Sequence, residues 1–587
     1  MKKKILLIPL FILAVVITIS CGSKKYKTYD KDLSIVTLHG YAEKSDTVTD
    51  IKDITAEGTL KLKFIEGEDY IPYIDAESYF TFIPEKIQKS TKYVDDKNEV
   101  DFIFEFGEKK ASVRIFPKEE KVYFENQLSY VYDEDNDSDS SAALRTVYGG
   151  DLDTKKMVDH VIDYKQYEFK TFRENDKTYL PLAFLDPLVT ASHTSSVFYN
   201  YEKLFMFTDT NALSEYKYKV NGKETNAIDE MKAKTEKVMP EYLRKFNKNH
   251  LYFMFDSFYG LREQKEITKM STYFESFDYS KQLLSDDPEA RANALELLIA
   301  TLDDSHTVAL TSSTPWGEED DKTLPQSLKQ DRATLEKALK NERARVYEEQ
   351  KLDLDGVRYS KDGKTAVITL DAFEVDNYVY DENKKLKSDK ELAESDHFFK
   401  ILNNLKEIDK KTGVSYVVID MSINSGGNSA TMAKILNLMS KQNSMALTFR
   451  DSNTNAIQTM TTKIDSNNDG KYDEKDVYGN KYKFFVLTSP VAFSCGTAMP
   501  FYAQHKKLAY IVGQTQGGGE CAVSQFVLPN GQVVSFSTPM HVSEYVEGNL
   551  VGDEAGVRAD ISLSYFDFYD IEKISTRIKS YLDFIKE

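Results

Sequence analysis

The chain has 587 residues, which allows two large domains or three to four smaller ones. Its 76 basic and 95 acidic residues give a net charge of −19, which argues against a nucleic-acid-binding protein because such proteins usually present a basic face. Apolar residues make up 41% of the chain, enough to form hydrophobic cores, so a globally disordered protein is excluded. Only Cys21, Cys495 and Cys521 are cysteines, which excludes a disulfide-stapled scaffold and a multi-zinc protein.

The N-terminus predicts a secretory signal peptide over residues 1–20. Three lysines precede an apolar run over residues 5–19, which is shorter than the roughly 20 residues needed to span a bilayer. Small residues surround Cys21, and this resembles a bacterial lipoprotein signal, in which the cysteine is lipidated and becomes the mature N-terminus. Thr18 departs from that pattern, which prefers Leu, Val or Ile three residues before the cysteine, and an ordinary cleaved signal is the alternative.

We therefore expect an extracytoplasmic protein of the bacterial cell envelope. Its membrane contact would be a lipid on Cys21, and residues 21–34, which are polar and lysine-rich, would form a tether.

The remaining sequence changes character near residue 248. Over residues 35–247, short β-rich runs with period-two alternation, such as 59–64 and 113–116, are separated by charged turns, which predicts an α+β accessory domain. Over residues 248–587, helical patterns are followed by alternating strands and helices, with continuously apolar strands at 416–419 and 484–487. This order predicts an α/β domain.

Two loops follow those apolar strands, at the position where open α/β sheets bind ligands. In the first, Gly426 and Gly427 precede a helix, where backbone N–H groups could face an anion or simply form a tight turn. In the second, Ser494 stands at the start of a helix, where a serine is either an N-cap or a nucleophile. In the second case the N–H of Cys495 would help to form an oxyanion hole.

A serine nucleophile needs a base, and the residues alone do not decide which of the eight histidines supplies it. His505 lies on the same predicted helix as Ser494, about 16 Å along its axis at roughly 1.5 Å per residue, which is too far for a hydrogen bond. His397 and His541 have no distinctive neighbours in the sequence. His306 follows a predicted helix that leads into the α/β region.

Residues 248–587 resemble peptidase family S41, which includes the tail-specific processing peptidases and the tricorn core protease. The family's motifs occur in its order: LDDSHT ending at Thr307, VID with Asn424, Gly426 and Gly427, the VLTS–FSCG segment around Ser494, IVGQT followed by three glycines, and EAGV beginning at Glu554. The resemblance implies a ClpP/crotonase-like β–α superhelix as the core of the α/β domain.

The resemblance also implies a mechanism and its residues. The processing-peptidase branch uses a Ser/Lys dyad, but the expected lysine position is Gly519 here. The tricorn-like branch uses Ser, His, a second Ser and Glu, which correspond to Ser494, His306, Ser305 and Glu554. The expected oxyanion-hole donors are the N–H of Gly426 or Gly427 together with that of Cys495.

The function implied is that of a lipid-anchored serine endopeptidase, which cleaves peptides or proteins through an acyl-enzyme and needs no cofactor for catalysis. The alternative is a non-catalytic lipoprotein of the same fold that binds peptide or cell wall.

Two further features remain open. In an oxidising exterior Cys495 and Cys521 could form a disulfide beside the expected site, and two inert buried thiols are the alternative. Residues 465–476 have calcium-loop spacing, with glycine at loop position 6, although a polar loop between strands explains the same residues. The calcium ligands would be Asp465, Asn467, Asp469, Asp473 and Asp476.

Overall fold

A computed structural model describes most of the chain. The described residues are 26–38, 56–79, 88–94, 99–106, 109–125, 145–153, 157–190, 197–207, 217–220, 223–226, 238–310, 314–318, 330–352, 356–375, 387–515 and 517–586. The predicted signal peptide and Cys21 lie outside these residues.

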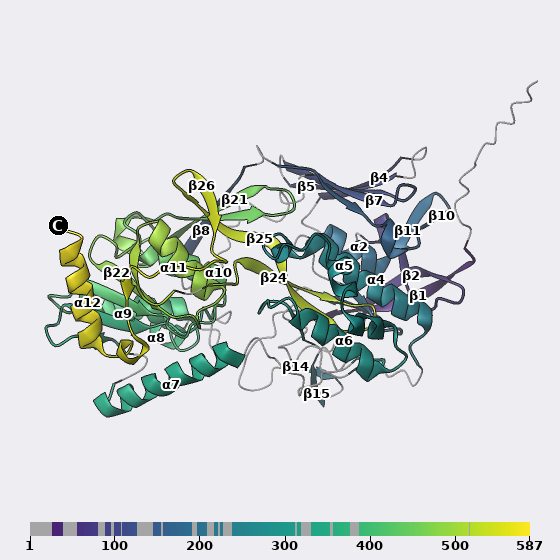
Figure 1. Cartoon of the computed structure of the whole chain (residues 1–587). Helices are drawn as coiled ribbons and strands as arrows, with labels where there is room; N and C mark the ends of the chain where they lie inside the picture. Colours follow the sequence, from purple (N-terminus) through teal and green to yellow (C-terminus); the bar gives the residue numbers. More distant parts are fainter. Residues whose placement is uncertain are drawn as a thin grey trace, which may run out of the picture.

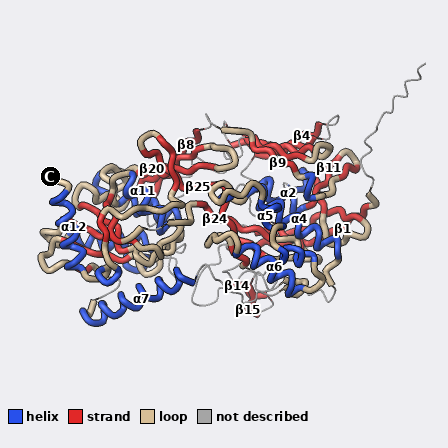
Figure 2. Tube along the Cα trace, in the orientation of Figure 1, coloured by secondary structure: helices blue, strands red, loops and turns tan. Residues whose placement is uncertain are grey.

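The described chain forms an elongated molecule of two lobes (Figure 1). One lobe contains the N-terminal strands together with residues 238–310, and the other contains most of the chain after residue 330. Coloured by secondary structure, the second lobe has strands enclosed by helices, whereas strands dominate the outer parts of the first (Figure 2).

The C-terminal lobe is built on a six-stranded sheet in which all the strands except the first edge strand are parallel to one another. Its order is β17 (Arg358–Tyr359), β18 (Thr365–Thr369), β19 (Tyr416–Asp420), β22 (Lys483–Thr488), β23 (Ala509–Gly513) and β27 (Ile561–Ser562). The interiors of the central strands β19 and β22 are continuously apolar, as expected for a parallel sheet with both faces covered.

Alternate residues of each strand enter two different cores. In β19, Val417 and Ile419 pack in the core that includes α9 (His397–Asp409), α10 (Ser429–Leu438) and α11 (Cys495–His505). Val418 faces the opposite core, which includes α7 (Gln330–Gln350) and α12 (Ile571–Phe584). The short helix α8 (Asp389–Leu392) closes the first core through Leu392.

The N-terminal lobe contains three sheets and a set of helices. The first sheet has the order β10 (Phe172–Glu174), β11 (Lys177–Pro181), β3 (Tyr73–Asp75), β2 (Ala56–Ile65), β1 (Thr28–Leu38), β13 (Leu204–Phe207) and β12 (Val197–Tyr199). The second has the order β4 (Gln88–Val94), β5 (Glu99–Phe106), β6 (Lys109–Phe116), β7 (Lys121–Glu125) and β9 (His160–Asp163), and the third pairs β14 (Lys217–Val220) with β15 (Lys223–Asn226). The helices are α1 (Ala76–Tyr79), α2 (Leu182–Val189), α4 (Glu241–Phe258), α5 (Met270–Glu275) and α6 (Pro288–Ala300).

A further sheet joins the lobes. Its order is β16 (Val308–Ala309), β25 (Val533–Val546), β20 (Met445–Asp451), β21 (Ile457–Asp465) and β8 (Arg145–Asp153), with β24 (Cys521–Val527) and β26 (Asn549–Gly552) also paired to β25. Phe536 of β25 packs in the N-terminal core, whereas Val542 of the same strand packs against the C-terminal core. β8 comes from the N-terminal half of the chain and pairs antiparallel with β21 along nine residues.

These contacts confirm the predicted α/β sheet and revise the predicted domains. The expected boundary between residues 247 and 248 falls inside α4. The helices α4 and α6 share one hydrophobic core with β1 and β2, so residues 248–310 pack with the N-terminal half. The sequence pattern could not reveal this because the change of composition near residue 248 does not report which core a helix joins. The ClpP/crotonase-like superhelix stays a prediction.

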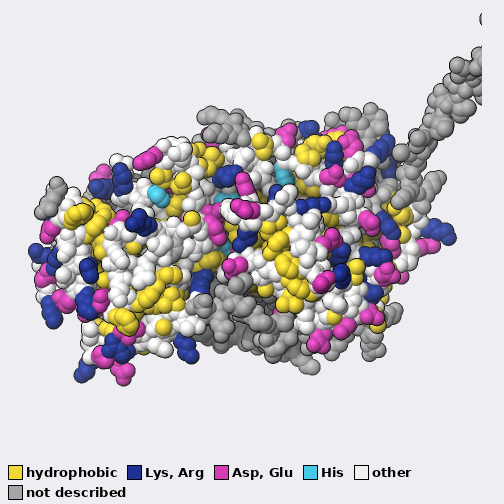
Figure 3. Space-filling view, in the orientation of Figure 1, with side chains coloured by type: hydrophobic (Ala, Val, Ile, Leu, Met, Phe, Trp, Pro, Cys, Tyr) yellow, Lys and Arg dark blue, Asp and Glu magenta, His cyan; other side chains and the backbone are white. Residues whose placement is uncertain are grey.

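The described surface carries charges of both signs. On the face seen in Figure 3, basic and acidic side chains are interspersed. None of the described helices is long and apolar enough to span a membrane.

We expect Gly260→Ala to destabilise the junction of the lobes. Gly260 lies in the 3₁₀ helix Gly260–Arg262, and a Cβ there would lie 2.0 Å from the carbonyl oxygen of Thr538 in β25. Because backbone atoms cannot yield easily, the free energy of unfolding should fall by about 1–3 kcal/mol in urea titrations. Gly150→Ala is the control, since its Cβ would meet only the Thr459 carbonyl oxygen at 3.6 Å. Equal stability of the two variants would contradict this packing.

Candidate active site

Three loops meet at the carboxyl edge of the parallel sheet. They follow β19, β22 and β23, and their described residues are 421–428, 489–494, and 514–515 with 517–520. Because these strands are parallel neighbours, their carboxyl ends lie at one edge. Gly426, Gly427 and Ser494 are therefore brought together as the sequence predicted.

Ser494 has the backbone of a strained turn. Its φ is +55° and its ψ is −129°, an arrangement that non-glycine residues rarely adopt. It precedes α11 at the N-cap position, but its side chain makes no capping hydrogen bond. Its carbonyl oxygen accepts hydrogen bonds from the N–H groups of Thr497 and Ala498. The N-cap alternative is therefore not supported, and the hydroxyl is left for another role.

Glycines crowd the backbone of Ser494 from two sides. A Cβ on Gly426 would lie 2.8 Å from the Ser494 Cβ, and a Cβ on Gly519 would lie 2.7 Å from the Ser494 nitrogen. The N–H of Ser494 donates to the carbonyl oxygen of Gly518 at 3.3 Å. These loops can approach the serine only because they carry no side chains at these positions.

The three predicted oxyanion-hole donors are not equivalent. The N–H of Gly426 donates to Oδ1 of Asn424 at 2.8 Å, so Gly426 is a correction to the prediction: it supplies space rather than a donor. Within the described residues, the N–H groups of Gly427 and Cys495 have no hydrogen-bond acceptor. Cys495 begins α11, where the first N–H groups of a helix lack intrahelical partners and favour negative charge.

His306 approaches the same site from the other lobe. It follows α6, and its own N–H donates to Oδ1 of Asp304 at 3.0 Å. Its ring packs on Phe493, the residue before Ser494, with centroids 4.6 Å apart. The guanidinium of Arg332, from the first turn of α7, lies 4.5 Å from the centroid of the same Phe493 ring. His306 and Arg332 thus both contact the side chain next to the predicted nucleophile.

The environment of His306 favours the neutral imidazole that a general base requires. Burial lowers the pKa of His306 to about 4; the charge of Asp304 opposes this change, and the charge of Arg332 adds to it. Its Nδ1 atom is buried without a hydrogen-bond partner among the described residues. No hydrogen bond joins His306 to Ser494, as is common in unliganded sites that tighten only when substrate binds.

Glu554 is bonded to the glycine segment that packs against Ser494, and among the described residues no hydrogen bond joins it to the imidazole of His306. Its carboxylate Oε2 accepts hydrogen bonds from the N–H groups of Gly519, at 3.0 Å, and Glu520, at 3.1 Å. Burial raises the pKa of Glu554, and the charges of Glu520 and Asp304 raise it further. Ser305 is half-buried, and in the described part of the chain no hydrogen bond joins it to His306 or Glu554. The expected orienting contacts of Ser305 and Glu554 with the imidazole are therefore not formed.

Residues 364–563, which include Ser494 and Glu554, match the family model described as Peptidase family S41. The chain carries an S41 peptidase domain. The match supports a serine-type peptidase, as the sequence motifs predicted. His306 lies before the matched residues, in the segment that packs with the N-terminal lobe.

The solved structures similar to this chain are distant. A protein of Parabacteroides merdae ATCC 43184, described as a candidate peptidase, is 14% identical with a TM-score of 0.38, over 58% of this chain and 96% of that one. A lipoprotein from Streptococcus agalactiae is 13% identical with a TM-score of 0.35, over 59% and 99%. The tricorn protease is 11% identical with a TM-score of 0.33, over 83% and 46%. No curated protein matches the chain.

The two cysteines of the S41 domain are free, buried thiols, so of the two alternatives left open the structure has the inert thiols and not the disulfide. The thiol of Cys495 donates to the carbonyl oxygen of Gly427 at 3.1 Å, whereas that of Cys521 lies 3.7 Å from Nδ1 of His541. Burial raises the pKa of Cys495 to about 12 and that of Cys521 well above its usual value. Both thiols therefore stay protonated at neutral pH, which leaves Ser494 as the nucleophile in this loop.

The expected calcium loop does not form a preassembled site. Oxygens of Asp465 accept hydrogen bonds from the N–H groups of Asp469 and Gly470, and Asp476 accepts those of Asn467 and Asp473. Among the residues that the structure describes, no three His, Cys, Asp or Glu side chains are arranged to hold a metal ion. Calcium binding stays a prediction.

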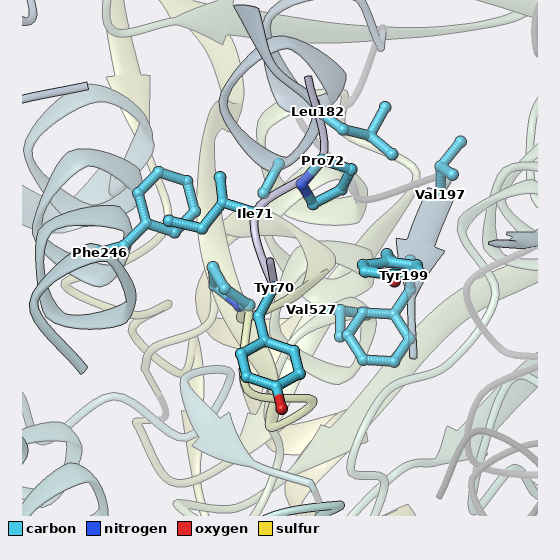
Figure 4. A pocket seen from close by; sticks show the side chains of 11 residues that line it. Tyr70, Ile71, Pro72, Leu182, Val197, Tyr199, Phe246 and Val527 are labelled. Atoms are coloured by element: carbon cyan, nitrogen blue, oxygen red, sulfur yellow. The ribbon is translucent and has the colours of Figure 1, made fainter. Parts of the chain in front are cut away.

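An apolar pocket lies away from the S41 site. It is lined from both halves of the chain, by residues that include Tyr70, Pro72, Val197, Phe246 and Val527 (Figure 4). None of Ser494, His306, Ser305 or Glu554 lines it. The pocket therefore has no part in the peptidase chemistry considered below.

Several residues of the site were not predicted. Asp304 lies within the LDDSHT motif and could have been recognised there as the acceptor that fixes His306. Arg332, Glu520 and His541 carried no usable signal, since each meets its partner only through contacts between distant segments.

We expect Arg332→Gln to move the acid limb of the pH profile of kcat/KM to higher pH. The positive charge of Arg332 lowers the pKa of His306, so its removal raises that pKa, and the base becomes protonated at a higher pH. Peptide hydrolysis measured from acidic to neutral pH would reveal the shift.

Two variants control this experiment. Arg332→Lys keeps the charge and should keep the profile. Arg345→Gln removes an exposed charge from the same helix, where Arg345 pairs with Glu342 and Glu349, and should change nothing. Superimposable profiles for Arg332→Gln and wild type would refute the assignment of His306 as a general base whose pKa is lowered by Arg332.

Proposed function

We propose that this protein is an extracytoplasmic, lipid-anchored serine endopeptidase that hydrolyses peptide bonds through an acyl-enzyme on Ser494. The carrying observation is the geometry of Ser494, whose side chain does not cap α11 although the residue occupies the N-cap position. Such a strained residue persists only where its surroundings fix it, as at active sites.

Acylation begins with attack of the Ser494 Oγ on the carbonyl carbon of the scissile bond. His306 takes the hydroxyl proton, and the carbonyl oxygen becomes an oxyanion that the N–H groups of Gly427 and Cys495 stabilise. As the C–N bond breaks, the imidazolium of His306 gives its proton to the leaving amine. The product of this half-reaction is an ester between the substrate's acyl group and Ser494.

Deacylation repeats these roles with water as the nucleophile. His306 takes a proton from water, and the resulting hydroxide attacks the ester carbonyl. The second oxyanion is stabilised by the same N–H groups, those of Gly427 and Cys495. When the C–O bond breaks, Ser494 recovers its proton from His306 and the carboxylic acid product leaves. Because burial keeps His306 neutral at neutral pH, it can accept a proton in both steps.

A second candidate is a non-catalytic lipoprotein of the same fold that binds peptide or cell wall. It is favoured by the absence, among the described residues, of hydrogen bonds that join the His306 imidazole to Ser494, Ser305 or Glu554. The strained backbone of Ser494, whose side chain does not cap α11, favours the peptidase over the binding protein. Labelling and cleavage assays distinguish these two functions.

We expect wild-type protein to be labelled covalently by a fluorophosphonate and to cleave peptides, and Ser494→Ala to do neither. Removing the nucleophile of such a peptidase costs on the order of 10⁴–10⁶ in kcat. Ser425→Ala is a matched control, since Ser425 is exposed in the neighbouring loop, and it should label normally. Wild-type protein that neither labels nor cleaves would favour the binding protein.

We expect the full chain, expressed in a bacterium, to incorporate a fatty-acid label on Cys21 and to partition with membranes. Cys21→Ala should lose the label and the membrane association, because acyl chains would be its attachment. Cys521→Ala should keep both. Unchanged labelling of Cys21→Ala would exclude this anchor.

A further inference from the structure

Behind the glycine loop, Glu520 and Glu554 hold each other's backbone. The Oε2 atom of Glu520 accepts the N–H of Glu554 at 2.9 Å. In return, Oε2 of Glu554 accepts the N–H groups of Gly519 and Glu520 at 3.0 and 3.1 Å. The two segments, which are distant in the sequence, are thus locked together by reciprocal hydrogen bonds.

The other oxygen of Glu520 is held by side chains from two further elements. Oε1 lies 2.5 Å from Nδ1 of His541, in β25, and accepts from Nε2 of Gln264 at 2.8 Å. Glu520 and His541 are 4% and 3% exposed, so this contact is shielded from water. A Cβ on Gly552 would lie 2.3 Å from Oε2 of Glu520, so the end of β26 packs directly against the carboxylate.

The groups around Glu520 suit an ionised carboxylate. Burial alone would raise the pKa of Glu520, but the hydrogen bond and charge of His541, with the donors of Glu554 and Gln264, lower it. An ionised carboxylate only accepts hydrogen bonds, so all of these donors are matched. A glutamine at this position would present an amide N–H₂ to at least one of them.

The locked segment is in contact with the nucleophile. The carbonyl oxygen of Gly518 accepts the N–H of Ser494, and Gly519 packs against the Ser494 backbone so closely that no Cβ would fit. A shift of residues 518–519 would therefore move Ser494 and the adjacent N–H of Cys495. A misplacement of about 1 Å in an active site can cost about 10²-fold in rate.

This network also joins the two lobes at the site. Gln264 follows the 3₁₀ helix Gly260–Arg262, whose Leu261 packs in the N-terminal core, whereas Glu554 lies between Val551 and Val557, which pack with the C-terminal core. Glu520 stands between them and bonds to both.

We propose that Glu520, held by His541 and Gln264, is a positioning residue of the peptidase reaction: it fixes Glu554 and the Gly518–Gly519 segment against the backbone of Ser494. Glu520 acts through these groups and does not touch the substrate. The inference rests on the proposed function of Ser494 as nucleophile. If Glu520 served stability alone, its replacement would affect folding without affecting turnover.

Three variants test this. Glu520→Gln keeps the side-chain volume but mismatches one donor, and kcat per titrated serine should fall about 10- to 100-fold with KM nearly unchanged. Gln264→Ala removes one donor from an exposed side chain, and it should show a smaller fall in kcat. Glu318→Gln is the control: Glu318 is 1% exposed and pairs with Arg291 and Asn530, so its loss should lower stability but leave kcat per titrated serine unchanged.

Titration with fluorophosphonate counts the folded, competent molecules, so loss of folding cannot imitate loss of turnover. Hydrogen exchange adds a readout that needs no activity: the amides of Ser494 and Gly519 should exchange faster in Glu520→Gln than in wild type and Glu318→Gln.

Wild-type kcat in both Glu520→Gln and Gln264→Ala, or unchanged exchange at Ser494 and Gly519, would overturn the inference. Failure of wild type to label or cleave would instead overturn the proposed function, and hydrogen exchange alone would then decide whether Glu520 fixes this segment.

Discussion

The site depends on the close approach of three backbone segments around Ser494. Gly426, Gly496 and Gly519 each lie where a Cβ would come within 3 Å of a neighbouring backbone atom or of the Ser494 side chain. Ser494 itself is held at a positive φ, a conformation that costs on the order of 1–3 kcal/mol and persists only when its surroundings fix it. Backbone packing thus sets where the hydroxyl and the N–H groups of Gly427 and Cys495 stand.

The second constraint is that the nucleophile and its base come from different lobes. Ser494 follows a strand of the C-terminal sheet, whereas His306 follows α6, which is packed in the N-terminal core. The segment of His306 is attached to β25 through the N–H of Ser537, which donates to Oγ1 of Thr307 at 3.3 Å. Since β25 enters both cores, its packing controls how the base meets the serine.

Burial assigns different chemical roles to neighbouring groups. It lowers the pKa of His306, which keeps a base neutral, and raises the pKa values of Cys495 and Cys521, which keeps two thiols inert. It also raises the pKa of Asp553 well above the usual value, whereas the donors around Glu520 lower the pKa of that carboxyl. Desolvation and matched donors, rather than residue type, decide which of these groups carries charge.

The sequence by itself predicted the α/β sheet and the S41 family, and it named Ser494, His306 and Glu554 as candidate site residues. These features are local: apolar strands, a serine before a helix, and short motifs in a fixed order. It could not determine that Asn424 occupies the N–H of Gly426, that Cys495 and Cys521 have separate partners, or that the helices after residue 248 pack with the N-terminal half. The sequence also did not predict the contact of Arg332 with Phe493 or that of His541 with Glu520. Those contacts link segments far apart in the chain, and only tertiary packing brings their atoms within hydrogen-bonding or stacking distance.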